Sequence, residues 1–256
     1  MKREIAVFSA GLVSLVLAWQ FGSAINPEFF PSLADVASRA YKLSTSPTLT
    51  GETALYHLRV SLRRIVIITI LAFIISIVLG IAMAALPIEA PMSNFLPFWM
   101  AFPPLVVILF CMTLLGFSDK TIIIAIFIST APYGIVNVWK GAKGVDSELF
   151  EMAEVFGMSQ QTVWRKIYFP AVLPYLFSTG RYLFSMVWKL TMLAEVFGVS
   201  VGIGARVRFW FNQGNLEFLL AYFLIFFVTL ALIEYGIIIQ IEKRAFSWRS
   251  DNASVV

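Results

Sequence analysis

Charged residues inside an apolar run are the part of this sequence most able to do chemistry. Arg181, Lys189 and Glu195 all lie within a stretch long enough to cross a membrane. A charge in the middle of a bilayer costs roughly 3 kcal/mol or more unless it faces protein or water. These three residues and the neighbouring Trp188 are therefore candidates for lining a pathway, in which Lys189 and Arg181 lend positive potential for an anion. The alternative is structural: a salt bridge of Lys189 with Glu195 or Glu234, and core packing for Trp188.

The sequence shows no pattern typical of a nucleotide-binding site, a metal site or a catalytic nucleophile. The pattern G-x-x-x-x-G-K-[ST], whose backbone cradles phosphates, is absent, so no Walker A site for ATP is predicted. The single cysteine, Cys111, and the single histidine, His57, argue against a metal site built from a cysteine or histidine cluster. We therefore expect no cofactor on this chain and no enzyme activity of its own. If the protein pumps, another chain must supply the energy.

The composition is that of a polytopic membrane protein. Of 256 residues, 59% are hydrophobic and 13% are charged, and the mean hydropathy is +0.84. A soluble domain is about half apolar and about a quarter charged, so this chain has no room for a large soluble domain. The net charge of +4 comes from scattered basic residues, and it indicates membrane topology and not nucleic-acid binding.

Six apolar runs approach or exceed the roughly 20 residues that an α-helix needs to cross the hydrocarbon core. We therefore expect an all-α membrane protein with about six transmembrane helices in a single domain, 1–256. The first run is too long for the apolar core of a signal peptide and is followed by a poor cleavage site. The expected spans are 5–25, 65–86, 95–115, 121–139, 171–197 and 217–241.

Prolines and glycines predict departures from regular helix within and between these spans. The third span contains three prolines and the fourth contains one: Pro97, Pro103, Pro104 and Pro132. Each removes a backbone donor, so the third helix should bend and the fourth should be broken. Within a membrane, the freed carbonyls must be satisfied by protein or by a water-filled cavity. The segment 198–216, which begins with a glycine-rich stretch, is expected to be a loop, and Ser32 is expected to cap a short amphipathic helix.

The longest densely polar segment outside the N-terminal third is 146–170, between the fourth and fifth spans. Asp146 or the next residue can cap a first short helix by accepting a hydrogen bond from a free backbone N–H. Gly157 can end that helix in the left-handed conformation. Ser159 can cap a second helix, which Pro170 is expected to close. Two short helices with a hinge predict a docking device for a soluble partner, and we call 146–170 the elbow.

The spacing inside the elbow resembles the EAA motif of binding-protein-dependent ABC permeases: E-A-A, three residues, G, nine residues, I-x-L-P. Met152 and Phe169 replace an alanine and the leucine of that motif. In that family the first helix is the coupling helix, which inserts into a cleft of a cytoplasmic ATPase subunit. The resemblance therefore implies that coupling to an ATPase rests on Glu151, Ala153, Glu154, Gly157, Ile167 and Pro170.

Other motifs resemble the nitrate/sulfonate/taurine branch of these permeases: P-S-L-x-D-V, H-L-x-x-S-L-x-R and G-I-x-x-A. The resemblance implies the permease subunit of an ATP-driven importer for a small, mostly anionic nutrient, such as a sulfonate, taurine or nitrate. Implied partners are a periplasmic or surface-anchored binding protein and two cytoplasmic ATPase subunits that carry ATP and Mg²⁺. A second permease copy is expected because the sequence holds no second half. The implied location is the bacterial inner membrane.

Basic residues do not orient the chain by themselves, because similar numbers fall on the two sides of the six-span arrangement. A cytoplasmic elbow is therefore an implication of the resemblance. Two other functions stay open. The chain could be the coupling subunit of a vitamin importer with a separate substrate-binding subunit, or a secondary transporter or channel that works without any ATPase.

Overall fold

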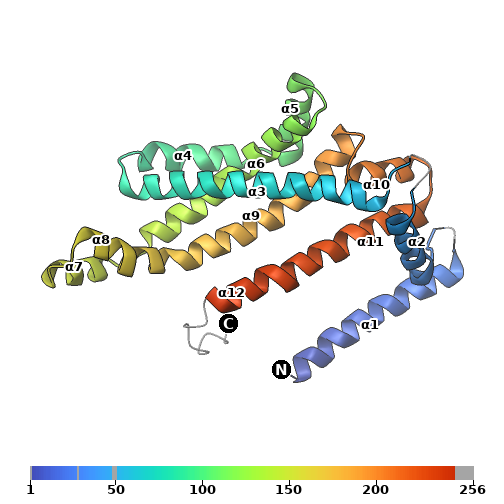
Figure 1. Ribbon diagram of the computed structural model, residues 1–256, viewed down its shortest axis with the longest axis horizontal. Helices are drawn as coiled ribbons and strands as arrows, with labels where there is room; N and C mark the ends of the chain where they lie inside the picture. The colour runs from blue at the N-terminus through green and yellow to red at the C-terminus, as the bar shows by residue number, and fades with distance from the viewer. Residues whose placement is uncertain (1, 28, 48–50, 246–256) are drawn as a thin grey trace. The chain divides into compact units, whose positions relative to one another are not determined.

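The computed structural model describes residues 2–27, 29–47 and 51–245, and in these ranges the chain is helical with no β-strand (Figure 1). The predicted all-α class is therefore confirmed. Contacts divide the chain into two compact units, which we describe separately. Unit 1 comprises Met1–Val60 and Ser200–Ile237, and unit 2 comprises Ser61–Val199 and Ile238–Val256.

Unit 1 is built from α1, α2, the first turns of α3, α10 and α11, with α2 and α10 both packing against α11. As predicted, Ser32 caps α2, because its hydroxyl accepts a hydrogen bond from the Asp35 backbone N–H at 3.1 Å. Arg39 ties α2 to α11 by donating to Glu217 at 2.7 Å. The bounds are Lys2–Ile25 for α1, Leu33–Thr45 for α2, Ala54–Ala85 for α3, Ile203–Asn212 for α10 and Leu216–Ile233 for α11.

The expectation that 198–216 is a loop is wrong, because α10 fills most of that segment. Its first turn is buried through Ile203 and Ala205, so burial of apolar side chains stabilises a helix where the neighbouring glycines indicate a turn. At the start of α10, the Gly202 backbone N–H donates to Nδ1 of the buried His57 at 3.3 Å. A histidine 145 residues away thus satisfies a helix-terminal donor, which no local pattern predicts.

Unit 2 centres on α6, which packs against α4, α5 and α9. Val138 and Ala142 of α6 form a buried apolar cluster with Val172 and Leu176 of α9. The bounds are Glu89–Met100 for α4, Pro104–Leu115 for α5, Asp119–Lys143 for α6 and Phe169–Gly198 for α9. A π-helical turn, η2 (Glu234–Ile238), continues α11 into α12 (Ile239–Ala245).

The third predicted span is two helices, because α4 and α5 are bent by 87° at a short break. The break falls at Ala101–Pro103, next to two of the predicted prolines. Pro104 lies at the start of α5, where its missing N–H costs nothing. The prolines therefore do more than kink one span, since they separate two helices of 12 residues each.

The fourth predicted span is not broken, because α6 is continuous across Pro132. Pro132 leaves the carbonyl of Ile128, four residues earlier, without a helical donor. The indole Nε1 of Trp99, on α4, donates to that carbonyl at 3.1 Å. In return, the Tyr133 hydroxyl of α6 donates to the carbonyl of Met100 at 3.1 Å, at the end of α4. Neighbouring side chains thus satisfy these proline-freed carbonyls, as expected for backbone in a membrane.

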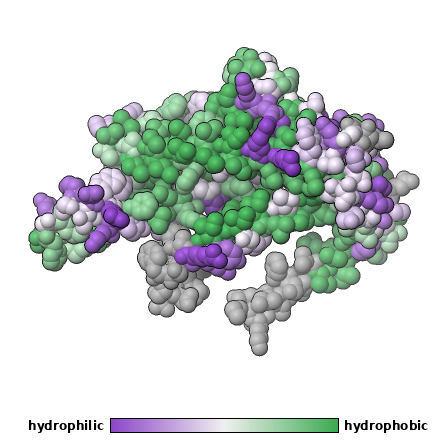
Figure 2. All heavy atoms as spheres, in the orientation of Figure 1, coloured by the Kyte–Doolittle hydropathy of each residue, from purple (hydrophilic) through white to green (hydrophobic). Residues whose placement is uncertain are grey.

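Three helical segments of the described chain are long and apolar enough to cross a membrane: α3, α6 and the segment Leu216–Arg244. The number rises to five if each bent pair, α4 with α5 and Gln160–Gly198 with α10, counts as one span. The first predicted span coincides with α1, whose part Val13–Ile25 is apolar but shorter. The count of six spans stays a prediction. Figure 2 shows a largely hydrophobic surface over α3, as expected for a helix against lipid.

Candidate functional site

The elbow follows α6 and leads into α9, and its two helical parts lie beyond the paired ends of those helices (Figure 1). Its elements are α7 (Ser147–Val155), α8 (Gln160–Val163) and the π-helical turn η1 (Trp164–Tyr168). The Asp146 side chain accepts from the Glu148 N–H at 3.0 Å, and the Ser159 hydroxyl accepts from the Thr162 N–H at 3.3 Å. Both predicted N-caps are therefore confirmed.

Gly157 ends α7 as predicted, with a φ of +61°. Its N–H donates to the carbonyl of Glu154 at 2.9 Å, and the Met158 N–H donates to the carbonyl of Ala153 at 2.9 Å. These two bonds define a Schellman motif, in which the left-handed residue reverses the chain just after the helix. The hinge between α7 and α8 therefore depends on one residue that favours this conformation.

The expectation that Pro170 closes the second elbow helix is wrong, because α8, η1 and α9 follow one another without a break. The widened turn η1 ends where the Phe169 N–H donates to the carbonyl of Trp164, and Pro170 falls in the first turn of α9. Pro170 has no backbone N–H to donate, and the widened π-helical turn directly before it changes the hydrogen-bond register of the continuous helix at that point. The elbow is thus rigidly continuous with a long helix of unit 2, and Ile167 and Pro170 are half-buried in this junction.

The outward face of α7 combines large apolar side chains with carboxylates. Val155 is 85% exposed and Phe156 is 76% exposed, whereas Ala153 is 1% exposed. The predicted coupling residues Glu151 and Glu154 are also exposed. A small residue at position 153 lets α7 pack closely, while its other face presents an apolar patch rimmed by charge. Such a patch is typical of a surface that binds another protein.

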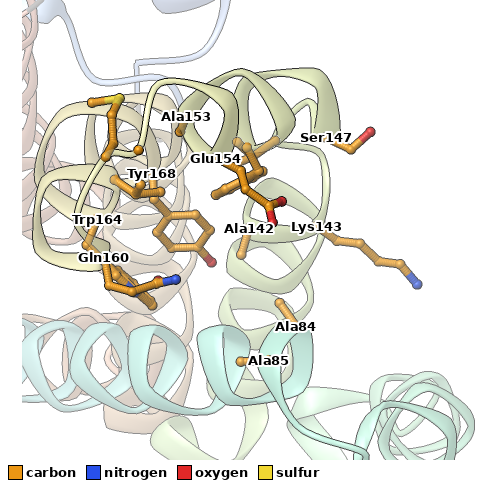
Figure 3. A pocket seen from close by; sticks show the side chains of 15 residues that line it. Ala84, Ala85, Ala142, Lys143, Ser147, Ala153, Glu154, Gln160, Trp164 and Tyr168 are labelled. Atoms are coloured by element: carbon orange, nitrogen blue, oxygen red, sulfur yellow. The ribbon is translucent and has the colours of Figure 1, made fainter.

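A cleft of about 830 Å³ lies behind the elbow, between α7 and the ends of α3 and α6 (Figure 3). Its aromatic wall is a row of rings: Tyr168 is 6.3 Å from Phe150 and 4.5 Å from Trp164, between ring centroids. Its polar lining includes Lys143, Glu154 and Gln160. Phe150 of α7 thus contacts Tyr168 of η1, the turn that leads into α9.

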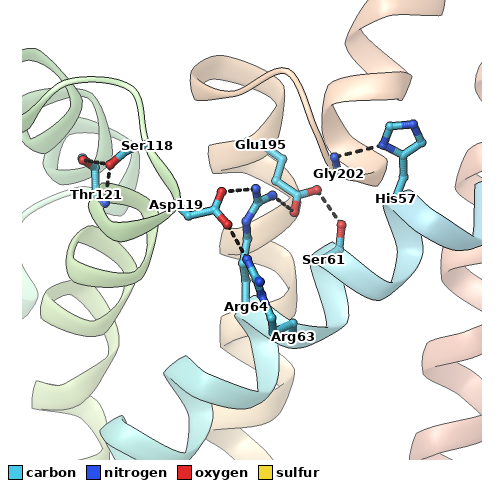
Figure 4. Close-up of polar contacts among 9 residues, drawn as sticks. All are labelled: His57, Ser61, Arg63, Arg64, Ser118, Asp119, Thr121, Glu195 and Gly202. Atoms are coloured by element: carbon cyan, nitrogen blue, oxygen red, sulfur yellow. Dashed lines mark hydrogen bonds and ion pairs between the residues drawn. The ribbon is translucent and has the colours of Figure 1, made fainter. Parts of the chain in front are cut away.

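A buried charge cluster joins α3, α6 and α9 at the opposite ends of α6 and α9 from the elbow (Figure 4). Arg64 is 1% exposed and Glu195 is 0% exposed, and their side chains are 2.6 Å apart. Ser61 donates to the other Glu195 oxygen at 2.8 Å. Asp119, at the start of α6, accepts from Arg64 at 2.5 Å and from Arg63 at 2.6 Å. We call these residues the Arg64 cluster.

The structure does not bring the four predicted pathway residues together. Glu195 belongs to the Arg64 cluster and not to a salt bridge with Lys189, so the Glu195 form of the predicted salt bridge is wrong. Lys189 is exposed on α9, and its closest partner in the described part of the chain is the Trp188 ring, 5.7 Å from the ammonium to the ring centroid. Arg181 pairs with Glu242 at 3.0 Å.

Sequence reasoning missed Arg64 as the partner of Glu195. The two residues are 131 positions apart, so only the fold could pair them. One pattern was available: Ser61 and Arg64 are one helical turn apart, and both belong to the H-L-x-x-S-L-x-R motif. Their role in that motif is to face the same carboxylate.

Comparisons with known proteins show which family and which relatives this chain resembles. The family described as "Binding-protein-dependent transport system inner membrane component" matches residues 74–246, which is more than half of the chain. A probable ABC transporter permease protein of Brucella melitensis is 25% identical over 81% of this chain and 84% of its own length. The nitrate import permease NrtB of Synechocystis is 23% identical over 90% of this chain and 82% of its own length.

Two further proteins extend these findings. The putative aliphatic sulfonates transport permease SsuC of Bacillus subtilis is 26% identical over 53% of this chain and 49% of its own length. Among solved structures, the MetNI methionine ABC transporter in inward-facing conformations matches with a TM-score of 0.59 at 15% identity, over 69% of this chain and 89% of the matched chain. At that identity the likeness concerns the fold alone.

Proposed function

Because the chain belongs to the family of inner-membrane components of binding-protein-dependent transport systems, it is an ABC importer permease subunit, and we propose that it forms the translocation pathway for a small oxyanion. ATP hydrolysis takes place on two cytoplasmic ATPase subunits that dock on the elbow. A binding protein outside the membrane delivers the substrate. A second copy of the chain completes the pathway.

The observation that carries this proposal is the outward face of α7. Val155 and Phe156 are two large apolar side chains that are mostly exposed, and they lie next to the hinge that the Schellman motif fixes. An ATPase cleft that covers this face would gain the burial of two large apolar side chains. Phe150 of α7 contacts the Tyr168 ring of η1, which continues into α9, so movement of the ATPase subunits can reach a membrane helix through this turn.

The substrate class is supported by the relatives and by one side chain. NrtB is named as a nitrate import permease and SsuC as an aliphatic sulfonates permease; nitrate and sulfonate are both small oxyanions. Lys189 carries a positive charge on a membrane helix with no acidic partner in the described residues. An ammonium group in that position must face water or protein, and a water-filled pathway for an anion meets that need.

The test is capture of the candidate ATPase by the chain with Phe156→Ala, compared with Phe98→Ala. Phe98 is 62% exposed on α4, away from the elbow, so it controls for the loss of an exposed ring. Truncation of an anchoring aromatic residue typically costs about 2 kcal/mol or more, so Phe156→Ala should lower co-purification at least about tenfold. Equal capture by both variants and the wild type would show that the ATPase does not dock here.

A further inference from the structure

The exposed side of the middle part of α9 is polar. Tyr175, Ser178, Tyr182, Ser185 and Lys189 recur at intervals of three and four residues, which places them on one face of a helix. Four of them are exposed and Ser185 is half-buried. At 1.5 Å per residue, they extend over roughly 21 Å. We call these five residues the α9 polar stripe.

The hydroxyl groups of the stripe have no partner within the described residues, unlike most other hydroxyls in the apolar helices. Thr179 donates to the Tyr175 carbonyl at 2.7 Å, and Ser129 and Thr130 donate to carbonyls four residues earlier at 2.8 Å each. Such back-bonding satisfies a hydroxyl that cannot reach water. Neither Ser178 nor Ser185 makes a hydrogen bond of this kind in that part of the chain, so both retain free donors.

The exposed side of α3, in the same unit, shows what a lipid-facing helix looks like in this protein. Ile67, Leu71, Ile74 and Val78 recur there at similar intervals, and all four are exposed. All four side chains are apolar, and the surface over α3 is largely hydrophobic (Figure 2). Two exposed faces of unit 2 therefore differ in chemistry, although both belong to long membrane helices.

We propose that the α9 polar stripe faces the aqueous pathway and passes an oxyanion from one hydrogen-bond donor to the next. Toward an anion, each hydroxyl donates one hydrogen and the lysine ammonium supplies up to three. Free donors in hydrocarbon would each cost free energy, whereas beside water and an anion they are satisfied. The inference rests on the proposed function and deepens it, because it identifies the side chains that bind the substrate during passage.

Helix α6 contributes to the same side of unit 2. The Tyr133 and Tyr182 rings are 6.3 Å apart, and Gly141 packs so closely on Tyr175 that an added Cβ would lie 2.4 Å from its ring carbon. Asn137 lies between Tyr133 and Gly141 on the same face of α6, and it is exposed. Its amide is therefore placed beside the middle of the stripe.

The inner end of the stripe opens into a hollow at the elbow. A cavity of about 480 Å³ is lined by Tyr175 and Ser178 of the stripe and by Asp146 and Leu149 of the elbow. This arrangement places the exit of the stripe next to the hinge that the ATPase moves. The carboxylate of Asp146 disfavours an anion at this end, so the last two hydroxyl groups of the stripe should hold the substrate only weakly.

Cysteine accessibility tests the stripe directly, because the chain has a single cysteine to remove. In the full chain with its importer partners, on the Cys111→Ser background, Ser178→Cys and Ser185→Cys are compared with Val78→Cys in membrane vesicles. The probes are charged methanethiosulfonate reagents, which react with thiols only in water. Both stripe variants should react at least about tenfold faster than Val78→Cys, at equal amounts of folded protein. Rates as low as that of Val78→Cys would overturn the proposal and place the stripe in lipid or in a dry contact between copies.

The sign of the charge is tested in the same system. Lys189 is one turn from Ser185, so its ammonium should attract an anionic reagent and repel a cationic one at Ser185→Cys. Lys189→Gln should lower the ratio of the two rates about fivefold in physiological salt. An unchanged ratio would show that Lys189 does not attract anions to the stripe, and it would overturn the proposal that the stripe passes an oxyanion. If the stripe residues react but uptake needs no ATP, the proposed function is refuted and the water-facing stripe stands. If uptake is driven by ATP but the stripe residues do not react, the proposed function stands and the water-facing stripe is refuted.

Discussion

Residue 157 adopts a left-handed backbone conformation. The geometry of the elbow therefore depends on whether the side chain at that position tolerates this conformation. The φ of residue 157 is +61°, and a Cβ added at this position would have no heavy atom within 4 Å. A substitution therefore acts through backbone strain and not through a clash. Gly157→Val should disfavour the elbow conformation by about 1–2 kcal/mol. We expect roughly tenfold weaker capture of the ATPase, measured by titration of the detergent-solubilised complex.

Asparagine provides the control at this position, because its side chain tolerates the left-handed region. Gly157→Asn should capture the ATPase nearly as well as the wild type, although both variants add a side chain of similar size. If the two variants lose the same amount of affinity, the hinge conformation is not what the ATPase recognises.

Arg64 should matter for stability more than its neighbour of the same type. Arg64→Leu leaves Glu195 buried without its cation, which costs about 3–5 kcal/mol when one partner of a buried pair is removed. The Arg63 side chain, which pairs with Asp119, is 60% exposed. Arg63→Leu should therefore lower the free energy of unfolding by less than about 1 kcal/mol. Thermal unfolding of the purified chain compares the two, and the account fails if their unfolding temperatures fall equally.

Proline tolerance in α6 depends on a partner helix, and a double-mutant cycle can show it. Trp99→Phe leaves the Ile128 carbonyl without a donor, at a cost of about 1–3 kcal/mol. In the Pro132→Ala background, the restored backbone N–H at position 132 satisfies that carbonyl, so Trp99→Phe should cost much less. Unfolding free energies of the four variants give the coupling, and additive costs would mean that the indole serves another purpose.

Local signals in the sequence predicted the elements that local bonds define. Ser32, Asp146 and Ser159 each cap a helix with their own side chain, and Gly157 ends one with its own backbone. Each of these features is formed by residues close together in the sequence, so a local sequence pattern can predict it.

Features that depend on distant residues were not predictable in the same way. The continuity of α6 requires Trp99 from another helix, and Glu195 takes its partner from α3. The start of α10 requires burial of its first turn and an acceptor nitrogen on His57. The caps and the hinge of the elbow were predictable because they are local, whereas the pairing of Glu195 was not, because it is formed across three helices.

At the scale of the whole molecule, the elbow and the Arg64 cluster lie at opposite ends of the same two helices of unit 2. The elbow follows the C-terminal end of α6 and precedes the N-terminal end of α9, and the Arg64 cluster ties their other ends to α3. The packing of α6 on α9 and the Arg64 cluster thus join these helices along their length and at the ends away from the elbow. This arrangement suits a permease whose access changes when ATPase subunits close.

ATP-driven uptake in proteoliposomes tests the central claim most directly. The chain is reconstituted with its candidate ATPase and loaded binding protein, and entry of nitrate and of a small alkanesulfonate is measured with ATP or with a non-hydrolysable analogue. The account predicts uptake of one of these oxyanions only when ATP is hydrolysed, and its loss with Gly157→Val but not with Gly157→Asn. Equal uptake by the chain alone, without the ATPase, would contradict it and identify a transporter that works by itself.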